Sequence, residues 1–388
     1  MRVALTCSPL PGLRAKESLA IARGAWLGKR PRDEVHGFPV SDGIAMPFAG
    51  SGADEVLVGA RATHVELGRA GERHFAHVDG ASVLFDYTEV FDGIPRPGRP
   101  SSSRLIGEDL AWAAAEGLTS VTIVLPVPGS LMDMGWGLLE ALAAGPADPT
   151  ALANESRAAA DAPGNGQHGD RAAVLRAARA AVTSLHITVV VSREQPLLGL
   201  SGIARSWMAQ GLDAVVAQTY ERGFADVVAE LSDAARTLPS RSLLLGTSEP
   251  DPARNIYAGA GAGTAFTLSL LGAMIHPIGQ LAIGPHIARE IDEADLLVCV
   301  TGHIGEDLPS SLLVAAQAAQ NAGIPVVVVY DSGGIRKGEL PGLGLNGAYE
   351  IRPDRSYEMP EESAQDVADI PGRLADLMGR VATTWGWD

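Results

Sequence analysis

The stretch LLVCVTGHIGEDLPSSLLVAAQAAQNAGIPVVVVY, residues 296–330, decides the fold class of this chain. It opens with a run of apolar residues at 296–300 and closes with another at 326–330. Short, continuous apolar runs of this kind are typical of strands that are buried on both faces of a parallel sheet. The Ala- and Leu-rich segment 310–322 between them is expected to be helical. The stretch therefore predicts a strand–helix–strand unit, and with it an α/β protein.

The same pattern stands at the start of the chain. Residues 2–6 and 35–40 are expected to be strands, and residues 16–28 the helix between them. Residues 53–91 differ, because their short alternating runs favour mixed or antiparallel sheet. The segment GIPRPGRP, 93–100, predicts a loop or a crossing between domains, since its prolines prevent regular structure.

Composition excludes several classes of protein. The chain has 388 residues, 46% of them hydrophobic, so disorder is not its main state. Its formal charge of −16 repels phosphate backbones, and nucleic acid is not expected as a partner. No apolar run is long enough to span a membrane. The N-terminus lacks the pattern of a signal peptide, and the two cysteines make no disulfide framework, so a cytoplasmic protein is expected.

Ligands of open α/β sheets bind in the loops that follow the strands. Asp42 directly follows the strand at 35–40, Asp133 precedes a helix, and Asp307 lies beyond the strand at 296–300. Such carboxylates could bind Mg²⁺ or accept the proton of a substrate hydroxyl. The alternatives are a turn residue for Asp42 and a helix N-cap for Asp133.

The Gly-rich segment AGAGAGT, 258–264, stands before a predicted helix that extends through Met274. Closely spaced glycines such as Gly261 and Gly263 let the backbone approach a phosphate or a substrate. The alternative is close helix packing by small residues. The segment matches neither the dinucleotide-binding nor the P-loop fingerprint, which argues against a dehydrogenase.

Few other side chains indicate chemistry. Arg14 and Lys16 flank the first loop and could neutralise phosphate, or could simply lie in solvent at a helix start. His303 lies in the loop after 296–300, where a lone histidine is usually structural. His74 and His77 are expected on opposite faces of a strand and so make no zinc pair.

The motifs, taken in order, resemble those of the bacterial glycerate kinases, which phosphorylate D-glycerate with ATP. The matching pieces are FPVSDG at 38–43, DMGWGLLEAL at 133–142, QPLLGLSG at 195–202, AGAGAGT at 258–264, DLLVCVTG at 295–302 and AGIPVVVV at 322–329. The resemblance implies two α/β domains. A Rossmann-like parallel sheet is expected from residues 1–50 and 286–388, and an inserted second domain of mixed sheet from residues 51–285.

The resemblance also implies an ATP-dependent phosphotransferase that acts on a small hydroxy acid with Mg²⁺. Asp42 and Asp133 are then the catalytic carboxylates, and either could hold the metal. The residues expected to contact substrate or phosphate are Gly43, Gly261, Gly263, Gly302, Asp307, Arg14 and Lys16. The sequence indicates no oligomeric state.

The chain departs from the family pattern at several charged positions. Ser8 and Pro11 stand where the family has Asp and Lys, and residues 44–47 read IAMP where it has Gly-Glu-Gly-Thr. TGHIG at 301–305 replaces Thr-Gly-Glu-Gly-Arg. Because phosphoryl transfer depends on cations against the developing charge, these losses leave two hypotheses open. The protein is a divergent kinase, or it is a catalytically degenerate homologue that binds a metabolite or a partner.

Overall fold

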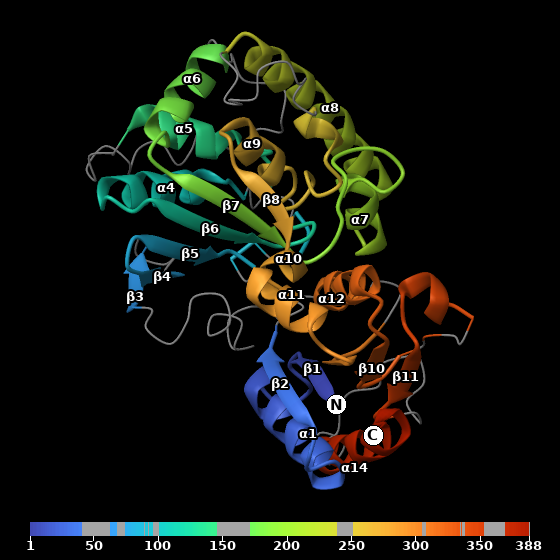
Figure 1. The fold of residues 1–388 in the computed structure, drawn as a ribbon. Coiled ribbons are helices and arrows are strands. Elements are labelled where there is room, and N and C mark those ends of the chain that lie inside the picture. Colours follow the sequence, from blue (N-terminus) through green and yellow to red (C-terminus); the bar gives the residue numbers. More distant parts are fainter. Residues whose placement is uncertain are drawn as a thin grey trace. The chain divides into compact units, whose positions relative to one another are not determined.

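The computed structural model describes most of the chain and divides it into two compact units. The described residues are 1–40, 63–67, 74–88, 90–91, 93–95, 101–145, 171–238, 251–304, 308–333, 335, 338–352 and 369–387. One unit comprises Met1–Gly59 together with Pro277–Asp388, and the other comprises Ala60–His276 (Figure 1). The first and last parts of the chain therefore belong to the same unit.

The discontinuous unit is built on a five-stranded sheet in the order β11-β10-β9-β1-β2. Its strands are β1 (Arg2–Cys7), β2 (Glu34–Pro39), β9 (Leu296–Thr301), β10 (Val326–Tyr330) and β11 (Gly347–Glu350). Every neighbouring pair is parallel. The apolar runs at 296–300 and 326–330 are confirmed as β9 and β10. The Rossmann-like parallel sheet predicted from the sequence is also confirmed.

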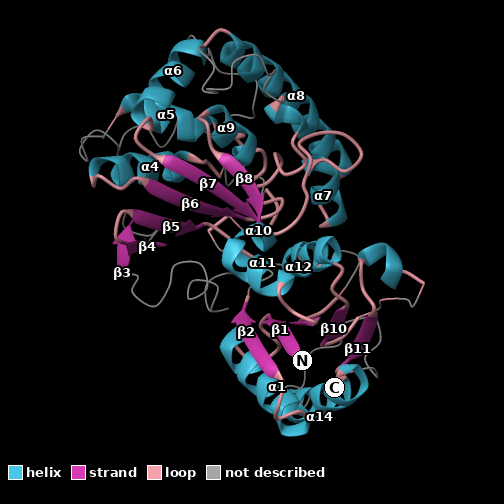
Figure 2. Ribbon diagram, viewed as in Figure 1, coloured by secondary structure: helices cyan, strands magenta, loops and turns pink. Residues whose placement is uncertain are grey.

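Helices cover both faces of this sheet (Figure 2). They are α1 (Ala15–Lys29), α10 (Ile278–Ala282), α11 (Pro285–Asp292), α12 (Ser310–Ala322) and α14 (Ile370–Trp385), with a short 3₁₀ turn at Leu340–Leu343. Alternate residues of β1 serve the two faces. Leu5 packs in the cluster with Trp26 of α1 and Leu374 of α14, and Ala4 packs in the cluster with Leu312 of α12. The unit is therefore a three-layer α/β/α structure.

The continuous unit is built on a six-stranded mixed sheet in the order β3-β4-β5-β6-β7-β8. Its strands are β3 (Thr63–Leu67), β4 (His74–Asp79), β5 (Ser82–Asp86), β6 (Ser120–Leu125), β7 (His186–Val191) and β8 (Met274–Pro277). Strands β3, β4 and β5 pair antiparallel, and β5, β6 and β7 pair parallel. A second α/β domain with a mixed sheet is thus confirmed.

The helices of this unit are mostly those that the sequence predicts. They are α4 (Arg104–Ala115), α5 (Trp136–Ala144), α6 (Arg171–Ala181), α7 (Ile203–Ala209), α8 (Ala214–Arg236) and α9 (Thr264–Leu270), with a 3₁₀ turn at Pro252–Arg254. The expected continuation of α9 through Met274 is wrong, because Gly272 has φ +92° and ends the helical run. Met274 instead begins β8. The Ala-rich sequence of 150–162 also favours a helix, but these residues lie outside those that the structure describes.

Two further features bear on the expected class of protein. Both cysteines are buried and free, and burial raises the pKa of the Cys299 thiol to about 12. Neither thiol is therefore a ready nucleophile. In the part of the chain that the structure describes, no helix combines the length and the apolar character needed to cross a membrane.

Candidate functional site

The parallel sheet of the discontinuous unit has a point where its connections diverge. From β1 the chain moves through α1 to β2 on one side, and from β9 it moves through α12 to β10 on the other. The carboxyl ends of β1 and β9 therefore form a topological switch point, where ligands of open α/β sheets bind. Ser8 lies there, buried, with its N–H donating to the carbonyl of Val300 at 2.8 Å. Gly302 follows β9 and lies next to the loop after β1. A Cβ built on Gly302 would be 3.6 Å from the carbonyl oxygen of Pro9.

Four polar side chains are linked along this edge of the sheet. Nδ1 of His303 lies 3.1 Å from Oγ of Ser332, which donates to the carboxylate of Asp331 at 3.2 Å. Arg352 forms an ion pair with the same carboxylate. The backbone joins the two loops as well, because Ile304 and Gly333 form a parallel bridge. The loops after β9 and β10 are therefore held as one structure.

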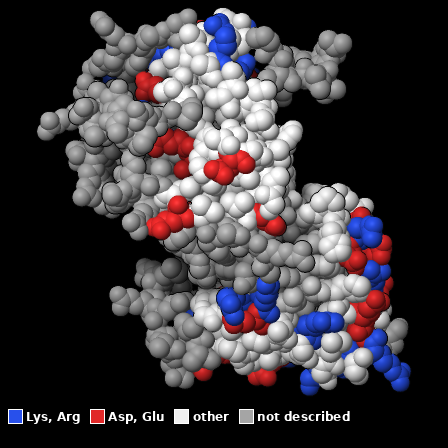
Figure 3. Space-filling view, turned by 90° about the vertical axis from the view of Figure 1, so that its left-hand side faces the viewer, with Lys and Arg blue, Asp and Glu red and all other residues white. Residues whose placement is uncertain are grey.

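The basic residues expected beside the first loop lie at the start of α1. Arg14 is exposed and pairs with Glu17 at 2.9 Å, and its hydrogen bond lowers the pKa of that carboxyl. Lys16 is exposed on the first turn of the helix. On the face shown in Figure 3, described basic side chains lie beside acidic ones. The charge of Arg14 is thus already balanced by an acidic neighbour.

Three of the predicted site residues have no described position relative to the others. Asp42, Gly43 and Asp307 lie outside the described residues. Their convergence with Asp133 stays a prediction.

Asp133 in the continuous unit is held by hydrogen bonds from two loops. Its Oδ2 accepts from Oγ of Ser102 at 2.7 Å, and from N–H and Oγ of Ser103 at 2.9 and 3.1 Å. The amides of Gly135 and Gly137 donate to Oδ1 and Oδ2, both at 3.2 Å. Four of these contacts converge on Oδ2, while among the described residues Oδ1 accepts only the one from Gly135, so Oδ2 is the fully occupied oxygen. Asp133 joins the N-terminal ends of α4 and α5, although the N-cap residues of these helices are Ser103 and Gly135 and not Asp133 itself.

The Gly-rich segment has no amide left for an anion. Every backbone N–H from Ala258 to Thr264 donates to a backbone carbonyl. Gly261 donates to Pro126 at 2.9 Å, and Ala262 donates to Pro128 at 2.6 Å. A phosphate cradle needs free N–H groups, so the segment is not a preformed one.

The glycines of this segment are needed for packing. A Cβ on Gly261 would lie 3.1 Å from Leu125, and one on Gly263 would lie 2.9 Å from Met134. Both glycines also have positive φ, +56° and +91°, which side-chain-bearing residues rarely adopt. The geometry therefore supports the packing alternative for this segment.

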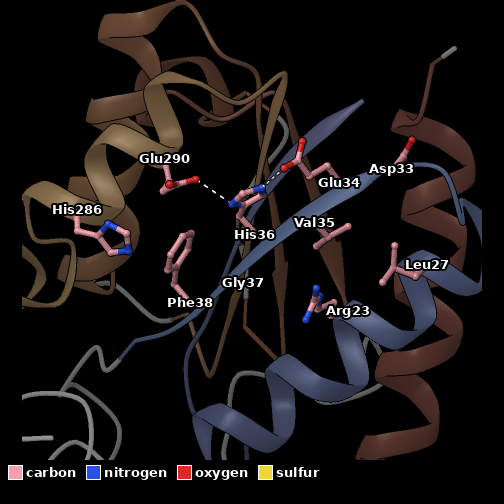
Figure 4. Close-up of a pocket in the computed structure, with 10 residues that line it drawn as sticks. All are labelled: Arg23, Leu27, Asp33, Glu34, Val35, His36, Gly37, Phe38, His286 and Glu290. Carbon is pink, nitrogen blue, oxygen red and sulfur yellow. Dashed lines mark hydrogen bonds and ion pairs between the residues drawn. The ribbon is translucent and has the colours of Figure 1, made fainter.

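A separate cavity of about 490 Å³ lies beside β2, at the edge of the sheet rather than at the carboxyl ends of its strands (Figure 4). His36 extends between Glu34 and Glu290, with contacts of 2.8 and 2.9 Å. Hydrogen bonding from Arg2 lowers the pKa of Glu290. Glu34, His36 and Glu290 of the cavity are thus paired with one another.

The described residues do not form a recognisable magnesium site. Among the described residues, no group of three or more His, Cys, Asp or Glu side chains is arranged to hold a metal. Asp133 does not fit as a ligand through Oδ2, because that oxygen accepts four hydrogen bonds from N–H and O–H donors. Asp42, the other predicted ligand, lies outside the described residues.

Sequence reasoning missed the side chains that support His303. Asp331 and Ser332 immediately follow a predicted strand, which was a usable signal, since that is where ligand loops begin. Arg352 carried no such signal. Its pairing with Asp331 arises only because β10 and β11 are neighbours in the sheet.

Comparison with known proteins agrees with the fold. The model of the glycerate kinase family matches residues 12–385. No curated protein matches the chain. A crystal structure from Salmonella typhimurium LT2, of a protein that carries the provisional name glycerate kinase 2, is similar with a TM-score of 0.66. At 17% identity it covers 99% of this chain and 98% of its own, which shows a common fold.

Proposed function

The chain belongs to the glycerate kinase family, and on that basis we propose that it is an ATP-dependent phosphotransferase. Its acceptor is a hydroxyl of glycerate or of a related small hydroxy acid. The observation that carries the proposal is the family match over residues 12–385, which includes the loops after β9, β10 and β11. The linked polar side chains at the switch point of the parallel sheet support it.

The predicted site residues have different roles in this proposal. Asp42, Gly43, Gly302 and Asp307 keep the substrate- or phosphate-side roles that the family resemblance implies, and Asp42 is the catalytic or metal-binding carboxylate. Lys16 contributes positive charge beside the first loop, where the charge of Arg14 is balanced by Glu17.

The residues of the continuous unit act more indirectly. Asp133 supports the site by holding two helix ends, because its Oδ2 is already occupied. Gly261 and Gly263 keep the loops after β6 and β7 in place rather than contacting phosphate. We also propose that the two compact units are the two domains expected from the sequence.

ATP supplies the phosphoryl group, and Mg²⁺ neutralises the developing charge in reactions of this class. No step is assigned to a metal at Asp133, since Oδ2 of that carboxylate does not fit a metal ligand. The net charge of −16 and the two free, buried cysteines support a cytoplasmic protein whose partner is a small molecule.

Turnover tests the proposal directly. The purified chain, given ATP, Mg²⁺ and a panel of small hydroxy acids headed by D-glycerate, should form a phosphorylated acid and ADP in equal amounts. A reaction without acceptor measures background ATP hydrolysis. Absence of any phosphorylated acid across the panel contradicts the proposal.

A second candidate follows from two specific observations. The family's Lys and Arg are missing from two loops, and the amides of the Gly-rich segment are all occupied. Both observations favour a degenerate homologue that binds a metabolite or partner without phosphoryl transfer. Titration calorimetry separates the two, because a degenerate homologue should give no heat with ATP while still binding an organic acid.

A further inference from the structure

The hydrogen bonds among the linked side chains at the carboxyl ends of β9, β10 and β11 have fixed donors and acceptors. The first of these contacts is the ion pair between Asp331 and Arg352, whose side chains are 1% and 5% exposed. Arg352 donates through Nε to Oδ1 of Asp331 at 2.6 Å, and through Nη2 to Oδ2. Breaking a buried pair of this kind is costly, because it leaves an uncompensated charge. Asp331 is therefore held as a hydrogen-bond acceptor.

Ser332 lies between Asp331 and His303, and its hydroxyl determines which ring nitrogen of His303 carries the proton. A carboxylate paired with arginine can only accept, so the hydroxyl of Ser332 donates its proton to Oδ2 of Asp331. The hydroxyl has one proton, so toward Nδ1 of His303, at 3.1 Å, its oxygen can only accept. Nδ1 must then carry the proton. The neutral ring has its lone pair on Nε2.

Nε2 is available for chemistry. Within the described residues, no hydrogen bond is made to Nε2, and the ring is half-buried. Charged groups joined to this network include Arg352, paired with Asp331, and Glu350, whose Oε1 accepts from the amide of Gly333 at 3.1 Å. The facing helix α12 has the sequence SSLLVAAQAAQNA and carries no titratable side chain. A neutral imidazole with an unused lone pair is a common general base in enzymes.

We propose that His303 is the proton acceptor for the substrate hydroxyl, with Ser332 and Asp331 as the residues that position it. This inference rests on the proposed phosphotransfer function. It places the base at the switch point of the parallel sheet, where the loops of β1 and β9 meet.

The step balances without any further reactant. The O–H bond of the acceptor hydroxyl breaks, and its proton moves to Nε2 of His303. The oxygen forms a bond to the γ-phosphorus of ATP while the bond from that phosphorus to the β,γ-bridging oxygen breaks, releasing ADP. The proton on the imidazolium is then lost to solvent.

The tautomer of His303 can be measured independently of activity. Nitrogen NMR of the ¹⁵N-histidine-labelled full chain, assigned with His303→Gln, should show the Nδ1–H form in the wild type. Ser332→Ala should lose this preference, and Ser332→Thr should keep it because the hydroxyl remains. The Nε2–H form in the wild type, or no change in Ser332→Ala, overturns the inference.

Kinetics test the proton transfer itself. His303→Gln should lower kcat/KM by about 10² to 10⁴-fold, which is the usual contribution of a general base. The wild-type rate should fall toward acidic pH, as expected of a reaction that uses a general base, and His303→Gln should lose that dependence. His186→Gln is the matched control, because His186 is exposed on β7.

Each outcome has a distinct meaning. A rate that falls toward alkaline pH, and only in the wild type, overturns the inference, because His303 then acts as a cationic anchor. If the wild type phosphorylates no acid in the panel, the proposed function fails and the proton transfer fails with it. A His303→Gln variant with the kcat/KM of the wild type overturns the inference alone.

Discussion

Asp133 is a residue for which the sequence allows several roles and the hydrogen bonds of the fold favour one. Its position in a loop before a helix is compatible with a metal ligand, a base or a cap. The oxygens accept from Ser102, Ser103, Gly135 and Gly137, so the carboxylate stabilises two helix ends that are distant in sequence. These contacts support a positioning role for Asp133, although the N-cap of α5 is Gly135.

Asp133→Asn should therefore destabilise the protein. An asparagine would place an NH2 group where one carboxylate oxygen now accepts hydrogen bonds, so donors such as Ser102 and Ser103 could lose their acceptor. The free energy of unfolding should therefore fall by about 2–4 kcal/mol. Denaturant unfolding of the full chain measures it.

The control is Asp226→Asn, an exposed position on α8 that should change stability by less than about 0.5 kcal/mol. If Asp133→Asn unfolds like the wild type and yet loses activity, the carboxylate has a chemical role instead.

The Gly-rich segment holds separate elements together. Its amides bind the loop after β6 at Pro126 and Pro128, and Gly259 binds the loop after β7 through the carbonyl of Gln195 at 2.7 Å. The segment thus fixes two loops at the carboxyl ends of neighbouring parallel strands. Its contribution to a ligand site in this unit is indirect, through the shape of those loops.

Gly259→Ala should be poorly tolerated. The new Cβ would lie 2.5 Å from the carbonyl oxygen of Pro196 and 2.6 Å from that of Gln195. Backbone atoms cannot move aside as a flexible side chain can, so a loss of about 1–3 kcal/mol is expected in thermal or denaturant unfolding.

Gly24→Ala provides the comparison, because nothing lies within 4 Å of a Cβ there and the residue is inside α1. It should be neutral or stabilising by up to about 1 kcal/mol. A Gly259→Ala protein of normal stability that has lost ATP binding would show that the segment contacts the nucleotide.

The two units of the whole chain differ in how they can form. The continuous unit has its own apolar core, with Trp207, Phe224 and Phe266 fully buried. The discontinuous unit depends on pairing β1 with β9, where Leu5 lies opposite Val298. Contacts between residues so far apart in sequence form late, because the intervening chain must be ordered or looped out first.

The segment 60–276, produced alone, should therefore fold cooperatively, whereas segment 1–59 alone should stay unfolded. Circular dichroism and thermal melting of both segments, beside the full chain, measure this. An unfolded 60–276 segment would show that its core is insufficient without the rest of the chain.

Much of the fold was readable from local pattern. Strands β9 and β10 and helix α12 follow from apolar runs and an Ala-rich segment, because burial of such runs depends little on distant residues. The premature end of α9 was missed. A turn at Gly272 with φ +92° competes with continued helix, and the apolar pattern alone does not reveal it.

The site was less readable than the fold. The residue types in the loops after strands were visible, and so was the order of motifs that resembles the glycerate kinases. Whether an amide is free or a carboxylate is saturated depends on partners such as Gln195, Pro126 and Ser103, which come from other loops. The protonated nitrogen of His303 depends likewise on Asp331 and Arg352 across two strands. Hydrogen-bond partners that meet only after sheet formation cannot be inferred from spacing along the chain, and those partners decide which polar groups remain for chemistry.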